Sequence, residues 1–392
     1  MNKDKTIRLG IIGYGFRINV VSEQIKKLGD VRVVSICDRD LDAAREKAAV
    51  HEPNADEIRF FTSAEELLDG PKVDGILIGT NCSSHTDMAV KVMEQEIPLF
   101  LEKPVAVNEG QLVRMREASK IHGDKVVVSF PLRLTPWVDK VKEIVDSGVL
   151  GTIEHVQAVN NVPYGYCYFQ FWYRDNAETG GLWLQKATHD FDYINHILGQ
   201  KPTMIAATTS KQVFTGNHPE GLHCVDCAEK ETCLESPYNP GYIEKQGELM
   251  GIVPEQFMCA FAPDAGNEDS GSCIILYESG MHVSYSQNFY VKQKASKRGA
   301  RLMGYLGTVE FDWYSDEIKV YYHHREEVET HKLKNATSEG HGGGDEALAQ
   351  NFIGLIKGEF ASMCPLDQGV LSAEMCLTAK RSSQNQTFEK IN

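Results

Sequence analysis

The start of this chain reads as a strand, a glycine turn, a helix and a second strand that ends in an acid. Residues 6–12 form a short apolar and β-branched run that leads into the glycine turn. Apolar residues then recur with a helical period over 16–28, and 31–37 is an almost continuous apolar strand that ends at Asp38. This order is typical of a doubly wound parallel sheet whose first turn approaches a phosphate group. It predicts an α/β unit at the N-terminus.

Two glycines in this turn, Gly13 and Gly15, suit a dinucleotide. They let the backbone turn sharply and approach a pyrophosphate, whose charge is stabilised by the amides at the helix start. We expect Phe16 and Arg17, which begin that helix, to lie beside the cofactor too. The third small residue of the usual G-x-G-x-x-G pattern is Ile18 here, which predicts less close packing of helix on strand. A glycine pair alone also fits an ordinary strand–helix turn, so this interpretation depends on its context.

The acid that ends the second strand bears on which cofactor is bound. Asp38 could accept hydrogen bonds from both ribose hydroxyls, and its charge repels a 2′-phosphate. The sequence therefore favours NAD over NADP. Arg39 counts in the other direction, because its cation could face such a phosphate.

Strands and helices continue to alternate up to residue 130. Further strands are expected over 75–79, 99–102 and 126–130, with a capping-box helix start at Ser63. Ligands of such sheets lie beyond the carboxyl ends of the strands. The residues expected at those ends are Gly13, Asp38, Thr80, Asn81 and Lys103. We therefore expect a Rossmann domain over 1–130 with its ligand site at this edge.

The rest of the chain, 131–392, reads as a second α+β domain. Strand-like runs over 273–277, 281–290, 307–312 and 318–322 follow one another without helices between them. That pattern is typical of a large, mostly antiparallel sheet with one covered face.

Composition restricts the class of partner. The formal charge of −15 argues against nucleic acid or an anionic membrane, because both require clustered positive charge. No apolar run approaches the length of a membrane span, and the first residues lead directly into a strand without an apolar signal segment. We expect a cytoplasmic protein.

At this point the chain resembles the Gfo/Idh/MocA oxidoreductases, the family of glucose-fructose oxidoreductase and the inositol dehydrogenases. The resemblance covers nearly the whole chain. It rests on Gly10-x-x-Gly13-x-Gly15, Asp38, the turn ending in His85, Glu102-Lys103-Pro104, Leu150-Gly151-Thr152-Ile153, and Gly180-Gly181 leading to His189-x-x-Asp192.

The resemblance implies roles for particular residues. Thr80, Asn81 and His85 match the loop beside the adenosine and the nicotinamide ribose. Glu102 and Lys103 match the pair at the nicotinamide, with Lys103 touching the substrate hydroxyl, and His189 matches the catalytic histidine. The family usually has an aspartate four residues before that histidine, where this chain has Gln185 followed by Lys186. The resemblance also implies a homodimer or homotetramer formed through the second sheet.

Residues around His189 allow more than one interpretation. Asp190 and Asp192 fit a helix N-cap and an acid of the first helical turn, and Asp192 could instead face the substrate. Lys186 is either a second cation over the substrate, with a catalytic role, or a partner of Asp190. We expect Gln185 and Asp192 to contact substrate.

An aromatic stretch over 164–174 could be core or pocket wall. Flat rings and hydroxyls suit a sugar, so we expect a pocket wall to which Tyr166, Trp172 and Arg174 contribute. Arg133 could reach the same cleft.

A cysteine pattern lies in an insertion over about 214–245. Cys224, Cys227 and Cys233 suggest a structural zinc, with Cys259, His218 or His223 as fourth ligand; free thiols at a loop turn are the alternative. Further along, Asp345 is expected to cap a helix that follows three glycines, and His341 could touch substrate.

These features together predict an NAD-dependent dehydrogenase acting on a hydroxyl of a sugar, an inositol or a related polyol. Lys103 would orient the hydroxyl and His189 would act as general acid and base. The alternatives are an NAD-dependent glycoside hydrolase that works by oxidation, elimination, addition and reduction, and a cofactor-binding sensor without turnover.

Overall fold

A computed structural model describes residues 6–242, 252–315, 317–333 and 339–392 of the chain. They form two compact units. The first consists of the described residues within Met1–Pro136 and Ser338–Glu374, and the second of those within Trp137–Thr337 and Met375–Asn392. The predicted insertion over about 214–245 is described up to residue 242 only.

The first unit is a doubly wound sheet, as predicted. Its strand order is β3-β2-β1-β4-β5-β6, and every pairing is parallel. The strands are β1 (Ile7–Ile12), β2 (Val31–Cys37), β3 (Arg59–Phe61), β4 (Gly75–Ile78), β5 (Leu99–Leu101) and β6 (Val126–Val128). The order reverses between β1 and β4, which is where such sheets bind their ligands.

Helices accompany these strands because each has an apolar face. In α1 (Phe16–Lys26) the buried residues are Ile18, Val21, Ser22 and Ile25, on one side of the helix. Ser63 Oγ accepts a hydrogen bond from Glu66 N and caps α3 (Ala64–Leu68), as predicted. The other helices of this unit are α2 (Leu41–His51), α4 (His85–Glu94), α5 (Glu109–His122), α11 (Glu339–Gly342) and α12 (Gly344–Lys357).

The second unit contains a nine-stranded sheet of order β14-β13-β12-β11-β7-β10-β9-β8-β15 among the described residues. Neighbouring strands are antiparallel except β7 and β10, which are parallel. The mostly antiparallel sheet is thus confirmed. Its strands are β7 (Ile153–Asn161), β8 (Pro202–Ser210), β9 (Ser270–Tyr277), β10 (His282–Asn288), β11 (Lys297–Gly304), β12 (Gly307–Asp312), β13 (Glu317–Tyr322), β14 (Val328–Lys332) and β15 (Glu389–Lys390).

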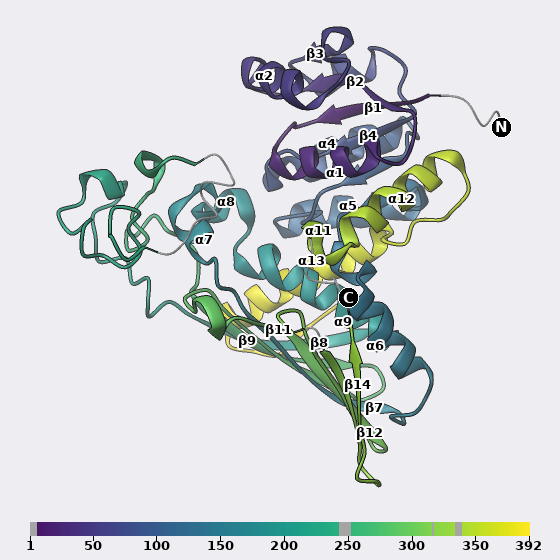
Figure 1. The fold of residues 1–392 in the computed structure, drawn as a ribbon, viewed down its shortest axis with the longest axis vertical. Helices are drawn as coiled ribbons and strands as arrows, with labels where there is room; N and C mark the ends of the chain where they lie inside the picture. Colours follow the sequence, from purple (N-terminus) through teal and green to yellow (C-terminus); the bar gives the residue numbers. More distant parts are fainter. Residues whose placement is uncertain (1–5, 243–251, 316, 334–338) are drawn as a thin grey trace. The chain divides into compact units, whose positions relative to one another are not determined.

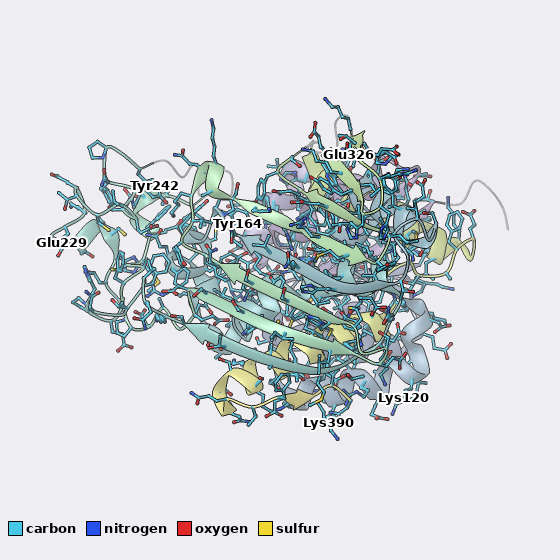
Figure 2. The ribbon with its side chains drawn as sticks, turned by 90° about the horizontal axis from the view of Figure 1, so that it is seen from below. Lys120, Tyr164, Glu229, Tyr242, Glu326 and Lys390 are labelled. Atoms are coloured by element: carbon cyan, nitrogen blue, oxygen red, sulfur yellow. The ribbon has the colours of Figure 1, made fainter. Side chains whose placement is uncertain are left out.

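Helices lie on one side of this broad sheet, as Figure 1 shows for α9 (Thr188–Leu198). Figure 2 shows the opposite face, with the strands nearest the viewer. Short helices α7 (Tyr166–Gln170) and α8 (Asn176–Thr179) lie beside one end of the sheet, and α6 (Pro136–Asp146) precedes β7. The long helix α13 (Leu366–Asn385) passes from the first unit into the second after Glu374.

Of the described residues, 339–374 belong to the first unit although they follow the strands of the second unit in the sequence. In the described part of the chain, no helix combines the length and the apolar character that a membrane span requires.

Candidate functional site

The glycine turn after β1 is built for a close approach of backbone to backbone. Gly13 has a φ of +81°, and a Cβ placed there would lie 2.6 Å from the backbone nitrogen of Thr80. Gly15 precedes α1 in extended conformation, and no side chain caps that end of the helix. The first-turn amides are therefore available to an anion, and this geometry fits the pyrophosphate of a dinucleotide. Phe16 is exposed at the start of the helix.

Helix α1 packs closely on the sheet in spite of Ile18, so the expectation of looser packing was wrong. A Cβ on Gly79, at the end of β4, would lie 1.9 Å from Cγ1 of Ile18. The space that a small residue usually provides on the helix is here provided by the strand. Ile18 is fully buried as a result.

Asp38 lies at the carboxyl end of β2, as predicted, and is half-buried. Its Oδ2 accepts a hydrogen bond from the Tyr14 backbone N–H at 2.8 Å, and its Oδ1 accepts one from the Asp40 N–H at 3.0 Å. A carboxylate has further acceptor capacity, so these bonds orient Asp38 and leave room for ribose hydroxyls. Arg39 is exposed next to it.

The loop after β4 holds its three predicted residues in a hydrogen-bonded arrangement. Ser84 Oγ donates to Thr80 Oγ1 at 2.8 Å, and Asn81 precedes the short turn over 82–84. His85 is buried, with Nδ1 2.8 Å from the Pro104 carbonyl oxygen and Nε2 3.1 Å from the Thr80 carbonyl oxygen. Burial lowers the pKa of His85, although these two carbonyls oppose the shift. The ring therefore joins the Thr80 loop to the segment after Lys103.

Glu102 and Lys103 follow β5 at the same edge of the sheet. Glu102 is buried, and its Oε1 accepts hydrogen bonds from Ser129 Oγ at 2.9 Å and from Arg17 Nε at 3.4 Å. Lys103 is half-buried. Arg17 was predicted to lie beside the cofactor, and the structure shows its guanidinium bound between Glu102 and a second acid, Asp345.

Asp345 does not cap α12, and that prediction was wrong. The cap position is Gly343, in the left-handed conformation. The Asp345 carboxylate instead binds both guanidinium ends of Arg17, at 2.7 and 3.2 Å, and lies 2.9 Å from His341 Nδ1. Burial alone would raise the pKa of Asp345, but the bonds from His341 and Arg17 outweigh it and lower that pKa.

In the second unit, His189 and Asp192 are buried on α9, whose cap position is Ala187. Asp190 is fully buried and accepts from Arg298 Nε at 2.8 Å. Its other oxygen accepts from Asn160 Nδ2 at 2.7 Å and from the Tyr285 hydroxyl at 2.8 Å. Asp190 is therefore a structural centre that joins α9 to three strands.

Gln185 and Lys186 lie in a π-helical turn, Trp183–Ala187, directly before α9. The Gln185 amide donates to the Thr179 carbonyl at 3.0 Å, so it helps to hold the preceding turn. Lys186 donates to the Tyr164 hydroxyl at 2.6 Å. Its predicted pairing with Asp190 does not occur as an ion pair, because Arg298 occupies that carboxylate.

Most of the aromatic stretch is core, and its interpretation as a pocket wall was largely wrong. Tyr166 has no exposed surface and belongs to a hydrophobic cluster with Phe169 and Phe171. Arg174 is buried and pairs with Asp264 at 2.8 Å. Trp172 is the member that remains on the surface, 43% exposed and stacked on Tyr173. Alternation of aromatics alone does not distinguish a core from a pocket.

Arg133, which was expected to reach the substrate cleft, is buried in the first unit. Its Nη1 donates to the Met363 carbonyl at 3.1 Å. The contact ties the turn after β6 to the segment between α12 and α13.

The cysteine insertion brings four sulfur atoms together without a metal geometry. Cys224, Cys227, Cys233 and Cys259 line one cavity of about 10 Å³. They are free thiols, and within the described residues no group of three or more His, Cys, Asp or Glu is arranged to hold a metal ion. Burial raises the pKa of Cys224 to about 12 and also raises those of Cys233 and Cys259. The structure therefore does not support the zinc prediction.

Two residues that the sequence did not single out contribute to these arrangements. Arg298 on β11 binds Asp190, and Tyr164 receives the bond from Lys186. The first pairing spans 108 positions, and nothing local in the sequence indicates it.

Comparison with known proteins agrees with this geometry. Residues 7–130 match the model of an oxidoreductase family with an NAD-binding Rossmann fold, and 142–392 match the C-terminal alpha/beta domain of the same family. The chain belongs to the Gfo/Idh/MocA oxidoreductase family. The first unit therefore contains the NAD-binding Rossmann fold of this family.

Relatives in this family are distant. The Bacillus subtilis (strain 168) protein YteT is 26% identical over 337 residues, 78% of this chain and 77% of its own length. A myo-inositol 2-dehydrogenase from Thermotoga maritima is 26% identical over 210 residues, 52% of this chain and 58% of that protein. The chain thus spans little more than half of this second relative.

Solved structures agree over the full fold. A levoglucosan dehydrogenase in complex with NADH and levoglucosan has a TM-score of 0.76 at 16% identity and covers 99% of this chain and 100% of its own. A myo-inositol 2-dehydrogenase from Lactobacillus plantarum has a TM-score of 0.70 at 18% identity, over 99% of this chain and 100% of that one. At these identities the likeness concerns the fold.

Proposed function

We propose that this chain is an NAD-dependent dehydrogenase that oxidises a secondary hydroxyl of a sugar, an inositol or a related polyol. The observation that carries the proposal is the edge of the first sheet, where the Gly13 turn, Asp38 and the Glu102–Lys103 pair follow three strands of one parallel sheet. The inositol and levoglucosan dehydrogenases among its relatives and structural neighbours support this class of substrate.

The cofactor would be held by the chain's own groups. The first-turn amides of α1 would bind the pyrophosphate, and Asp38 would accept hydrogen bonds from the ribose hydroxyls. A carboxylate at that position disfavours a 2′-phosphate, so we propose NAD in preference to NADP. Thr80 and Asn81 would contact the nucleoside side of the cofactor. When bound, NAD supplies the acceptor for the hydride.

Lys103 and His189 would handle the hydroxyl group. The Lys103 ammonium would hold and polarise the hydroxyl oxygen, and His189 would take the hydroxyl proton as the carbon loses its hydride. The products are a ketone and NADH. The Glu102 carboxylate, held by Ser129 and Arg17, fixes the strand end from which Lys103 extends.

A panel experiment tests the proposal. The purified protein is incubated with NAD or NADP and with free sugars, inositols, levoglucosan and aryl glycosides, and both NADH formation and aglycone release are measured. Net NADH from a polyol, with little NADPH, supports the proposal. Aglycone release that needs NAD without net NADH would make the protein a glycosidase, and cofactor retention without any turnover would make it a sensor.

We also propose a homo-oligomer formed through the nine-stranded sheet. Residues of β7 to β12 line a hollow of about 690 Å³ on this sheet, and Ile274, one of the lining residues, is 45% exposed. An apolar side chain in a hollowed sheet face fits contact with a second copy.

A further inference from the structure

Lys186 occupies an unusual position for a lysine. It lies in the π-helical turn before α9 and is 8% exposed. Its Nζ donates to the Tyr164 hydroxyl at 2.6 Å and lies 4.3 Å from the centre of the Tyr164 ring and 5.3 Å from that of Tyr168. Single π-helical turns are frequently found at functional sites.

Lys186 forms no ion pair with a carboxylate of the described residues. Asp190, four residues further on, is bound by Arg298, and among the described residues no carboxylate lies within ion-pair distance of Lys186. The groups that face Lys186 are Arg298 of β11, Asp190 of α9, Cys167 and Tyr168 of α7, and Tyr164. Burial, and then the Arg298 cation, lower the pKa of Lys186 to about 7, against the opposing effect of Asp190.

Around neutral pH, a large fraction of Lys186 is therefore a neutral amine with a free electron pair. Such an amine can accept a proton, whereas the neighbouring Gln185 amide cannot. His189 lies three residues after Lys186, in the first turn of α9, and is also buried. Tyr164, which is half-buried, lies at the end of the sheet next to the insertion in Figure 2.

We propose that the Tyr164–Lys186 pair receives the proton that His189 takes from the substrate hydroxyl, so that Lys186 is the group on which this proton comes to rest. This proposal builds on the dehydrogenase function proposed above. During oxidation the hydroxyl O–H bond breaks, the Tyr164 hydroxyl passes its proton to the Lys186 amine and takes one from His189, and Lys186 becomes an ammonium. The alcohol becomes a ketone, and the ammonium later releases its proton to water. Reduction of the ketone runs through the same groups in reverse.

The direction of the pH dependence follows from this role. Oxidation requires the neutral amine, so its kcat/KM rises with pH through about 7. Reduction requires the ammonium, so its kcat/KM falls as the pH rises through the same region. A lysine that acts only through its positive charge would change both directions in the same sense as it loses its proton, and one that only packs would change neither.

Stability provides a readout that does not depend on activity. Between pH 7 and 10 the unfolded chain holds a proton on Lys186 that the folded chain has lost, so the folded state gains stability as the pH rises. Lys186→Met removes this effect. We expect the unfolding temperature of the variant to exceed the wild-type value most below pH 7, with the gap closing towards pH 10. Lys380→Met is the matched control, because Lys380 is a second lysine of this unit held by Asn176 and the Gly180 carbonyl.

Activity assays then use Lys186→Arg and Tyr164→Phe. Arginine keeps the cation but cannot take up a proton. We expect both variants to lose about 100-fold or more in kcat/KM for oxidation and to lose the rise through pH 7, while Lys380→Met keeps it. If Lys186→Arg keeps the wild-type rate and profile, Lys186 acts only as a cation and the proposal is wrong. A pH-independent gap between wild type and Lys186→Met also overturns it. If the wild type produces no NADH with any polyol, the dehydrogenase proposal fails. The unfolding comparison still shows whether Lys186 loses its proton in the folded protein near pH 7.

Discussion

At the scale of single residues, the contact of helix α1 with the sheet shows that the small residue can lie on either side of a helix–strand contact. The small residue expected on the helix is Ile18, and the missing space is provided by Gly79 on β4. The glycine motif of the turn therefore did not predict the packing of the helix, because it describes the helix side of the contact and not the strand side. Gly13, in contrast, was predictable from sequence, since its left-handed backbone and its approach to Thr80 require glycine.

Gly13→Ala tests this turn. The new methyl group would lie 2.6 Å from the Thr80 nitrogen in a backbone conformation that costs a non-glycine residue about 1–3 kcal/mol. We expect NADH binding, followed by fluorescence titration, to weaken at least about 10-fold. Gly110→Ala, on the exposed face of α5, is the control and should bind as the wild type does. Equal dissociation constants for wild type and Gly13→Ala would show that the turn does not hold the cofactor.

At the scale of elements, one ion-pair cluster holds three parts of the first unit together. Arg17 on α1 binds Glu102 after β5 and Asp345 on α12. Because α12 comes more than 300 positions after α1 in the chain, this contact joins the late segment 339–374 to the start of the first unit. The cluster neutralises Arg17, so we expect the helix amides rather than this cation to dominate phosphate binding.

Asp345→Asn measures what the cluster contributes to stability. Hydrogen bonds to charged groups contribute about 1.5–3 kcal/mol, so we expect a loss of that size in the free energy of unfolding at pH 7. Since the folded-state pKa of Asp345 is lowered, its contribution is complete above the unfolded value near 3.9 and declines as the pH falls below about 4. Denaturant titration at pH 7 and at a pH below about 4 checks this decline. Asp87→Asn, which breaks an exposed pair with Arg114, should change little; an equal effect of the two substitutions would contradict the account.

Elements were predicted well where the signal is local and poorly where it is not. Five strands of the first sheet (β1, β2, β4, β5 and β6) read as short apolar runs before a turn, so their existence and the residues at their ends followed from sequence. The sixth strand, β3, was not predicted, because its three residues form too short a run to be recognised. The role of the aromatic stretch did not, because Tyr166 in a core and a tyrosine in a pocket have the same sequence pattern. The Asp190–Arg298 pair depends on the register of β11 beside β7, which no local pattern gives.

At the scale of the whole molecule, we propose one binding surface for each unit. In the first unit it is the carboxyl edge of the sheet, where the cofactor is proposed to bind. In the second it is the open face of the nine-stranded sheet, on which Ile274 is exposed.

Ile274→Glu tests the proposed role of that face. A charge buried against a second copy is unfavourable, so we expect the variant to sediment as a smaller species than the wild type in analytical ultracentrifugation. Its unfolding temperature should remain close to that of a monomeric unit with an intact core, because Ile274 does not belong to the buried set. Identical sedimentation of a wild-type oligomer and the variant would place the contact elsewhere, and a monomeric wild type would exclude it.

Substitution of Lys103 tests whether this lysine holds the hydroxyl whose carbon loses the hydride. NADH formation from NAD and the best polyol of the panel is measured for wild type, Lys103→Ala and Lys120→Ala, the last being an exposed lysine paired with Glu117. We expect Lys103→Ala to lose at least about 100-fold in kcat/KM while it still binds NADH, and Lys120→Ala to be unchanged. Undiminished NADH formation by Lys103→Ala would contradict the account.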